Sequence, residues 1–233
     1  MPAALPDLPA AGSDRIEIEG RSVEVTSLDK VLWPRAGFTK RRLLGYYLAV
    51  APALLPHLAG RALTLGRWPG GVDARGFAQT ECRGRPEWMR TAEVRLRGGE
   101  LRRQCMVEDL PSLLWVANQN AIELHAPLHR AASADRPTHA LLDLDPGPGA
   151  GLLDCCRVAL EFRAKLEARG LTGWAKTTGS AGLHVHVELG EAMPYAEVRR
   201  LVAEVAGELG GREPVAGGLL SAARRSAPEG ARR

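Results

Sequence analysis

The sequence predicts a mixed α/β fold for a chain of 233 residues. Stretches with the two-residue alternation of strands are interleaved with stretches that repeat apolar residues at the helical period. Hydrophobic residues make up 45% and charged residues 25%, a composition that can bury a core. The second half shows the pattern most clearly: a strand over 138–145, a helix over 151–169 ended by Gly170, a strand–turn–strand over 174–189 and a helix over 194–209.

The first half predicts a larger number of short elements. Residues 15–25 alternate around Gly20 and indicate a hairpin. Thr39 can cap a helix over 40–58, whose far end Pro52 and Pro56 would shorten or kink. Three further elements are expected: a strand over 62–68, two short strands within 91–107 about a glycine turn, and a helix from Asp109 to about 123.

These elements place one patterned domain between two unpatterned ends. Residues 1–14 are expected to be a flexible leader, and the domain to run over 15–209. Residues 210–233, with five arginines, five glycines and little apolar periodicity, are expected to be disordered. The start of the chain carries no early basic cluster, and no apolar run approaches the ~18 residues of a membrane span. We therefore expect a cytoplasmic protein.

Charge and cysteine content narrow the function classes. The net charge is +4, and only four of the 31 Lys and Arg residues are lysines. This mild basicity favours an anionic partner, although an arginine-rich composition alone would also produce it. The four cysteines have no Cys-x-x-Cys or Cys/His spacing, which argues against a zinc finger. Cys155 and Cys156 lie in a helical run and are expected to be buried, reduced thiols.

An acidic pair ends the strand over 138–145. Asp143 and Asp145 are two residues apart and therefore point to the same side of a strand. Two carboxylates so close repel each other, and a divalent cation relieves that conflict because hard cations prefer oxygen ligands. The alternative is a solvated strand end, in which an aspartate caps the following turn.

A second signal follows about 35 residues later. Thr177–Ser180 and Gly182 form a small-residue turn whose hydroxyls and free N–H groups can bind an anion, and His184 would project from the next strand. Since His184, His186 and Glu188 share a face of that strand, a metal site is a competing interpretation. The third interpretation is an ordinary hairpin whose histidines are exposed.

Several motifs together resemble one known family. They are DKVLWP at 29–34, Thr39–Lys40, YYLAVAPALLPHLAGRALTL at 46–65, RWPGGVD at 67–73, GFAQ at 76–79, IELH at 122–125, LLDLDPG at 141–147 and KTTGSAGLHVHV at 176–187. In order and spacing they resemble the polymerase domain of bacterial DNA ligase D, of the archaeo-eukaryotic primase superfamily. The resemblance implies a primase-polymerase fold: mixed, largely antiparallel sheets flanked by helices around a central cleft.

The resemblance implies a role for each matching residue. Asp143 and Asp145 match metal-binding aspartates of a site for two Mn²⁺ or Mg²⁺ ions. Thr178, Ser180 and His184 match the turn that holds the nucleotide triphosphate. His125 matches a histidine beside the nucleotide sugar, and Phe77 an aromatic that stacks on the base. Lys30 and Lys40 match lysines that grip the 5′-phosphate at a DNA gap, and Arg67 lies near the same cleft in the family.

The sequence also departs from the family. Ala78 replaces a second aromatic, and Ala181 replaces a frequent lysine. The family continues into strands with a third metal-binding aspartate and basic triphosphate contacts, where this chain has 210–233. We therefore expect a homologue truncated at the C-terminus, whose two-metal site lacks its third carboxylate. Glu188 is a candidate for the missing third carboxylate by its position alone.

The implied function is template-dependent nucleotidyl transfer that adds nucleotides, ribonucleotides in particular, at DNA ends or gaps during non-homologous end joining. The expected partners are gapped DNA with a 5′-phosphate, nucleoside triphosphates, Ku and an ATP-dependent DNA ligase, at the nucleoid and without a membrane. One alternative is a DNA-end-binding remnant that lacks catalysis. A metal-dependent hydrolase built on His184, His186 and Glu188 is the other.

Overall fold

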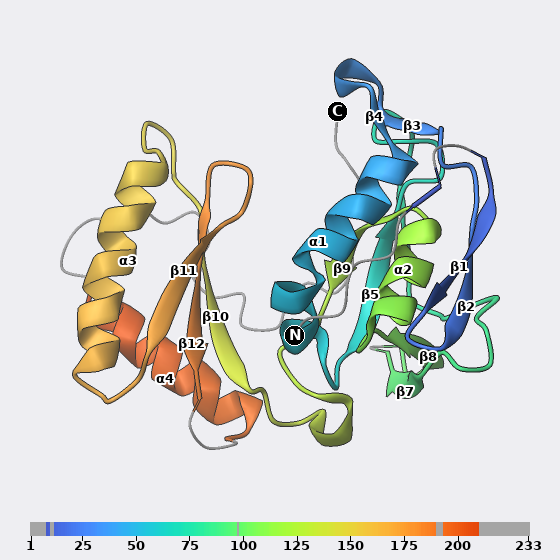
Figure 1. Ribbon diagram of the computed structural model, residues 1–233. Helices are drawn as coiled ribbons and strands as arrows, with labels where there is room; N and C mark the ends of the chain where they lie inside the picture. The colour runs from blue at the N-terminus through green and yellow to red at the C-terminus, as the bar shows by residue number, and fades with distance from the viewer. Residues whose placement is uncertain (1–7, 10–11, 97, 190–192, 210–233) are drawn as a thin grey trace. The chain divides into compact units, whose positions relative to one another are not determined.

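The computed structural model describes residues 8–9, 12–96, 98–189 and 193–209. They form two compact units, one up to Pro127 and the other from Leu128 (Figure 1). Both combine helices with antiparallel strands, so the mixed α/β fold is confirmed. Most of the expected leader, 1–7 and 10–11, and the expected tail, 210–233, lie outside the described residues. No helix in the described part of the chain is long and apolar enough to cross a membrane.

The first unit is built around a five-stranded antiparallel sheet. Strand β5 pairs with β6, β8 and β9, and β7 pairs with β8. Two separate hairpins, β1–β2 and β3–β4, precede the sheet in sequence. The elements are β1 (Asp14–Ile18), β2 (Arg21–Val25), β3 (Val31–Trp33), β4 (Phe38–Thr39), α1 (Lys40–Leu58), β5 (Ala62–Arg67), β6 (Phe77–Gln79), β7 (Thr91–Arg95), β8 (Leu101–Met106), α2 (Leu110–Asn118) and β9 (Ala121–His125).

The hydrophobic core of this unit joins α1, α2, β2 and one face of β5. Leu44 of α1, Leu63 and Leu65 of β5 and Leu113 of α2 are fully or almost fully buried together. Burying a leucine side chain contributes roughly 1.5–3 kcal/mol, so this cluster fixes the two helices on the sheet. The same packing carries α1 past Pro52 and Pro56 to Leu58, so neither proline ends the helix early.

One sequence prediction in this unit is wrong. The helix expected from Asp109 to about residue 123 ends at Asn118, and Ala121–His125 form β9 instead. Asn120 adopts the left-handed conformation, with φ of 57°, and turns the chain out of the helix. The residues that follow bond to β5, so sheet pairing prevails over local helix propensity.

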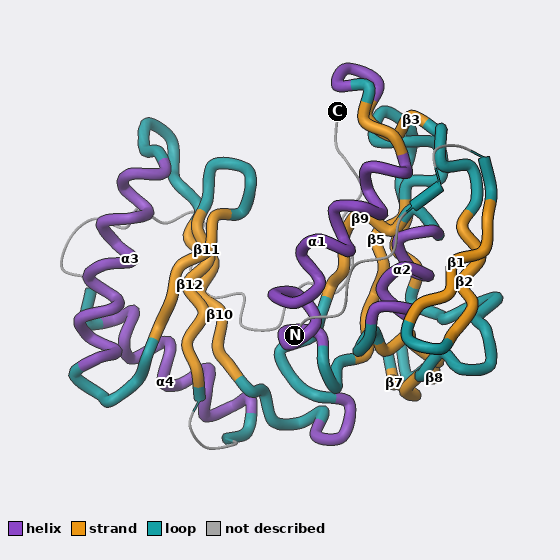
Figure 2. Tube along the Cα trace, in the orientation of Figure 1, coloured by secondary structure: helices purple, strands orange, loops and turns teal. Residues whose placement is uncertain are grey.

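The second unit has one three-stranded antiparallel sheet in the order β10–β12–β11. Helices α3 and α4 lie on one face of this sheet (Figure 2), where Phe162, Val185 and Val202 belong to one core. The opposite face carries the alternate residues of the strands and is more exposed. The elements are β10 (His139–Leu144), α3 (Leu152–Glu167), β11 (Gly173–Thr177), β12 (Leu183–Glu188) and α4 (Tyr195–Gly207).

The cysteines divide between the two units. Cys155 is buried and Cys156 partly buried in α3, and both are free thiols, as expected. Cys82 and Cys105 form a disulfide in the first unit, which the sequence did not predict. Their separation of 23 residues has no recognisable motif, because sheet pairing alone brings them together.

Candidate functional site

A hairpin brings two of the four lysines together. Strand β3 starts after Lys30, and β4 ends before Lys40. Val31 pairs with Thr39, and the main-chain N–H of Lys40 donates a 2.8 Å hydrogen bond to the carbonyl of Lys30. Gly37 closes the hairpin with φ of 58°, a conformation that costs glycine little. The ten-residue spacing of the lysines is therefore the length of one hairpin.

The Lys40 ammonium is buried without an acidic partner. The residue is 2% exposed, and its Nζ lies 3.4 Å from the Thr26 hydroxyl. None of the ion pairs among the described residues includes Lys40 or Lys30. Burial, together with the nearby positive charges of Lys30 and Arg67, lowers the pKa of Lys40 to about 8. An anion bound here would offset both the burial of the ammonium and its repulsion from Lys30 and Arg67.

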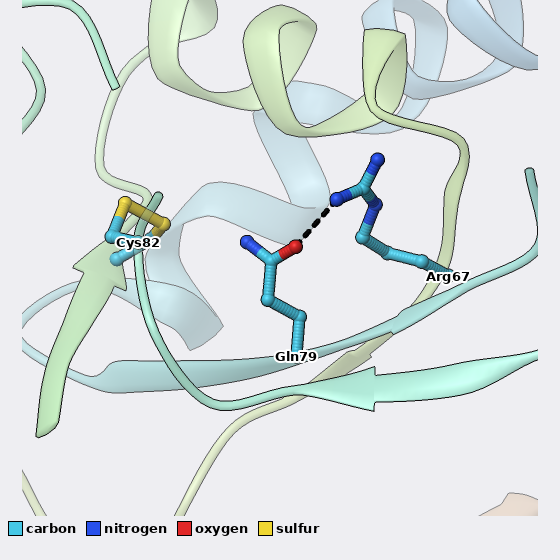
Figure 3. Close-up of a disulfide and its surroundings, with 4 residues drawn as sticks. Arg67, Gln79 and Cys82 are labelled. Atoms are coloured by element: carbon cyan, nitrogen blue, oxygen red, sulfur yellow. Dashed lines mark hydrogen bonds between the residues drawn. A yellow bond between two sulfur atoms is a disulfide. The ribbon is translucent and has the colours of Figure 1, made fainter. Parts of the chain in front are cut away.

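Two neutral glutamine side chains hold Arg67 beside these lysines. Its Nε donates to the carbonyl of Gln119 at 2.7 Å, and its terminal nitrogens donate to Gln79 Oε1 at 2.5 Å (Figure 3) and to Gln119 Oε1 at 3.3 Å. Burial lowers the pKa of Arg67 from its usual value. Because amide acceptors carry no charge, they orient the guanidinium and leave its positive charge uncompensated.

Phe77 extends this group of cations with an aromatic surface. It pairs with Arg67 across β5 and β6, its ring lies 5.4 Å from the guanidinium carbon, and it is 48% exposed. Gly76 before it has no room for a side chain, because a Cβ would lie 2.4 Å from the ring of Trp68. The RWPGGVD and GFAQ motifs thus pack against each other and place Phe77.

His125 lies on the other face of the same sheet. It pairs with Thr64, whereas Phe77 pairs with Arg67, and residues 64 and 67 point to opposite faces of β5. Its Nε2 is 2.8 Å from Glu123 Oε2. The structure therefore brings Phe77 to the lysine side of the sheet and does not bring it to His125, the other residue expected at the nucleotide.

In the second unit, Asp143 and His184 face each other across paired strands. Asp143 of β10 is opposite His184 of β12, and the distance from Asp143 Oδ1 to His184 Nε2 is 3.3 Å. Both lie on the face that α3 and α4 leave uncovered, since their neighbours Leu144 and Val185 are buried in the core. Lys176 of β11 pairs with His184 from the other side.

The glycine turn packs against the second aspartate. A Cβ on Gly182 would lie 2.7 Å from Asp145 Oδ1 and 2.9 Å from the carbonyl of Leu144, so only glycine fits there. The Thr178 hydroxyl donates to the carbonyl of Gly182 at 3.1 Å and accepts from the N–H of Ser180 at 3.3 Å. These bonds shape a compact turn whose hydroxyls lie beside the acidic pair.

The donor set fits a divalent cation at the acidic pair. Asp143 and Asp145 supply hard oxygen ligands, and neither is bound by an arginine or lysine among the described residues. His184 is the one ion-pair partner of Asp143 in that part of the chain. The described residues contain no group of three His, Cys, Asp or Glu side chains placed to hold a metal, so the arrangement of His184, His186 and Glu188 does not form, and the acidic pair has no third ligand of these types.

The structure thus separates the expected site residues into two groups. The first unit holds Lys30, Lys40, Arg67, Phe77 and His125, and the second holds Asp143, Asp145, Thr178, Ser180 and His184. Sequence reasoning missed the supporting residues Thr26, Gln79, Gln119 and Glu123. For Gln79 and Glu123, the sequence did offer a signal, because they lie within the GFAQ and IELH motifs.

The chain is similar to known proteins. A family model described as LigD, primase-polymerase domain, matches residues 39–225. The chain is 34% identical over 190 residues to a multifunctional non-homologous end joining protein LigD from Mycolicibacterium smegmatis, covering 80% of this chain and 25% of that protein. It is 31% identical over 185 residues to a bifunctional LigD from Bacillus subtilis, covering 79% of this chain and 30% of that protein. The chain therefore spans about a quarter to a third of these relatives.

A solved structure is also similar. It is the polymerase domain from Mycobacterium tuberculosis ligase D in complex with DNA, with a TM-score of 0.74 and 34% sequence identity. The match covers 79% of this chain and 67% of that one.

Proposed function

Because the chain belongs to the LigD primase-polymerase domain family, we propose that it is a template-dependent nucleotidyltransferase. It adds nucleotides, including ribonucleotides, at DNA ends or gaps during non-homologous end joining. The observation that carries this proposal is the open face of the second unit, where Asp143 faces His184 and the Thr178–Gly182 turn packs against Asp145. Carboxylates beside an anion-binding turn are what a metal-bound triphosphate requires.

Each group on this face has a separate task. Asp143 and Asp145 hold Mn²⁺ or Mg²⁺, which supplies charge stabilisation to the attacking and leaving oxygens of the transfer. Thr178 shapes the turn through its bonds to Gly182 and Ser180, and the Ser180 hydroxyl and the remaining N–H groups of the turn hold the triphosphate. His184 hydrogen-bonds the phosphates from β12 and is itself oriented by Asp143. The family resemblance assigns the nucleotide sugar to His125, whose ring Glu123 holds within the first unit.

The cations of the first unit bind the DNA end. Lys30, Lys40 and Arg67 provide three positive charges whose described acceptors are neutral, which suits a dianionic 5′-phosphate. Phe77 beside Arg67 offers a ring on which a base of the DNA can stack, whatever its sequence. The similar structure is a complex with DNA, which supports DNA binding by this chain. We propose the cytoplasm at the nucleoid as the location and Ku and an ATP-dependent DNA ligase as partners, since the relatives are non-homologous end joining proteins.

Extension of a gapped duplex tests the proposal. A one-nucleotide gap with a 5′-phosphate is offered with Mn²⁺ and each nucleoside triphosphate, and addition opposite the template base is measured. The proposal expects template-directed addition that disappears in the Asp143→Asn variant. Addition that ignores the template, or that survives this substitution, would contradict it.

A second candidate is DNA-end binding without turnover. It is favoured by one observation: Lys30, Lys40, Arg67 and Phe77 all belong to the first unit and are assembled without the acidic pair. Under this candidate the chain binds a 5′-phosphorylated gap tightly but extends it at least 10²-fold more slowly than a complete polymerase site would, since single electrostatic contributions are worth ~10²–10³ in rate. The same extension assay, combined with gap binding, separates the two.

A further inference from the structure

The Cys82–Cys105 disulfide lies shortly after β6, the strand whose Phe77 and Gln79 contact Arg67. Figure 3 shows Cys82 near Gln79 and Arg67, and Gln79 is three residues before Cys82 in the chain. Cys105 belongs to β8 and pairs with Leu63 of β5. The disulfide therefore ties the segment after β6 to β8, which pairs with β5, the strand that carries Arg67.

Besides its pairing with β5, strand β6 is held by the Gln79–Arg67 hydrogen bond and by the packing of the preceding Gly76 against Trp68. It is three residues long and pairs with β5 alone, through Leu65–Arg67. After it, the N–H of Cys82 donates to the carbonyl of Arg103 at 2.7 Å, and the disulfide is the covalent link at that point. A pairing of so few residues is marginally stable by itself. Strand β6 carries both the Phe77 ring and the Gln79 side-chain amide that contact Arg67.

Both sulfur-bearing residues are 2% exposed, yet Cys82 lines a surface cavity. The charged residues that also line the cavity are Arg85, Arg102 and Arg103 together with Glu81 and Glu93, so cations outnumber carboxylates there. Nearby cations stabilise a thiolate, the form that attacks a disulfide. The Nε of Arg102 is buried and has no hydrogen-bond partner among the described residues, so its charge is only partly met by Glu81 and Glu100.

We infer that Cys82 and Cys105 form a reversible thiol-oxidation site whose redox state sets the affinity of the first unit for a DNA 5′-phosphate. This rests on the proposed binding of that phosphate by Lys30, Lys40 and Arg67. Oxidation joins the two sulfurs, and the two electrons and two protons pass to a low-molecular-weight disulfide, which becomes two thiols. The bond holds Gln79 and Phe77 against Arg67. Reduction by a dithiol reverses the step and releases β6.

The test compares the two redox states of the full chain. Protein is equilibrated with oxidised glutathione or with dithiothreitol, and mass spectrometry after alkylation gives the state of each cysteine. Binding is then measured for one gapped duplex bearing a 5′-phosphate or a 5′-hydroxyl. We expect the oxidised protein to prefer the phosphate and the reduced protein to lose about tenfold of that preference. Reoxidation should restore it, which separates a local effect from unfolding.

Two double variants make the test specific. Cys82→Ser with Cys105→Ser should show the reduced behaviour under both conditions, and its melting temperature reports whether it folds. Cys155→Ser with Cys156→Ser removes the two free thiols of the second unit and should respond as the unmodified chain does. If the first variant does not fold, the reversible cycle of the unmodified protein decides.

Two results would overturn the inference, and they are distinguishable. Equal preference for the phosphate in both redox states would remove the redox role and leave the proposed phosphate binding intact. Absence of any preference in the oxidised protein would contradict the proposed phosphate binding itself, and with it the redox role.

Discussion

The main-chain N–H of Lys40 donates a 2.8 Å hydrogen bond to the carbonyl of Lys30. This bond closes the β3–β4 hairpin and fixes the two side chains beside each other, one exposed and one buried. Repulsion between them is part of the reason why the pKa of Lys40 is low. The hairpin thus holds like charges together, an arrangement that an anion stabilises.

Replacing both lysines should remove the response to a 5′-phosphate. We expect Lys30→Ala with Lys40→Ala to bind 5′-phosphorylated and 5′-hydroxyl gaps equally. Each lost phosphate contact should also flatten the slope of log K against log salt by about one unit. The measurement is a salt titration of gap binding. Lys165→Ala, which changes a lysine paired with Glu208 in the second unit, is the matched control. Retained discrimination in the double variant would refute the role of these lysines.

The phosphate preference should fall as the pH rises through Lys40's titration. Below a pKa of about 8 the ammonium is charged and attracts the phosphate, and above it the neutral amine does not. A bound phosphate favours the charged form, so the midpoint measured in the complex lies higher. Gap affinity is compared at pH 7, 8 and 9. The Lys40→Arg variant keeps its charge and should lose less preference over this range; an identical profile would contradict the assignment to Lys40.

Removing either carboxylate charge should abolish metal-dependent nucleotide binding. Asp143→Asn and Asp145→Asn each keep the shape of the side chain and delete one anionic ligand, so nucleotide affinity with Mn²⁺ should fall at least tenfold. Gap binding in the first unit should not change. Asp135→Asn, an exposed aspartate near Arg136, is the control. Calorimetric titration with and without metal measures the effect, and unchanged affinity in both variants would exclude this metal site.

Gly182 should tolerate no side chain. In Gly182→Ala the new Cβ would meet Asp145 Oδ1 and the Leu144 carbonyl, so the turn must move, at a cost of about 1–3 kcal/mol. We expect weaker nucleotide binding and a lower melting temperature. Gly147→Ala, whose Cβ meets nothing within 4 Å, is the matched control for the same loop region. Equal nucleotide affinity in the two variants would show that the turn does not depend on this contact.

Most of the regular elements could be predicted from local pattern. The hairpin around Gly20, α1, β5, β10, α3 and α4 all have strong periodicity or clear end signals. The failure at residues 119–125 has a specific reason. AIELH is compatible with a helix, and it becomes β9 only because β5 offers a bonding edge far away in the sequence. The short strands β3, β4 and β6 were missed because two or three residues carry no period.

The candidate site likewise has features that the sequence predicts and features that only the fold determines. By itself, the sequence determined which chemistry is present: two aspartates at the end of a strand, a glycine turn with hydroxyls, and two lysines ten residues apart. Those signals are local, since strand alternation and turn composition act within a few residues. Only the tertiary structure decided which side chains support them, that Phe77 and His125 are on opposite faces of β5, and that Cys82 meets Cys105. Such contacts depend on sheet register between distant strands, because a shift of one residue would move each side chain to the other face.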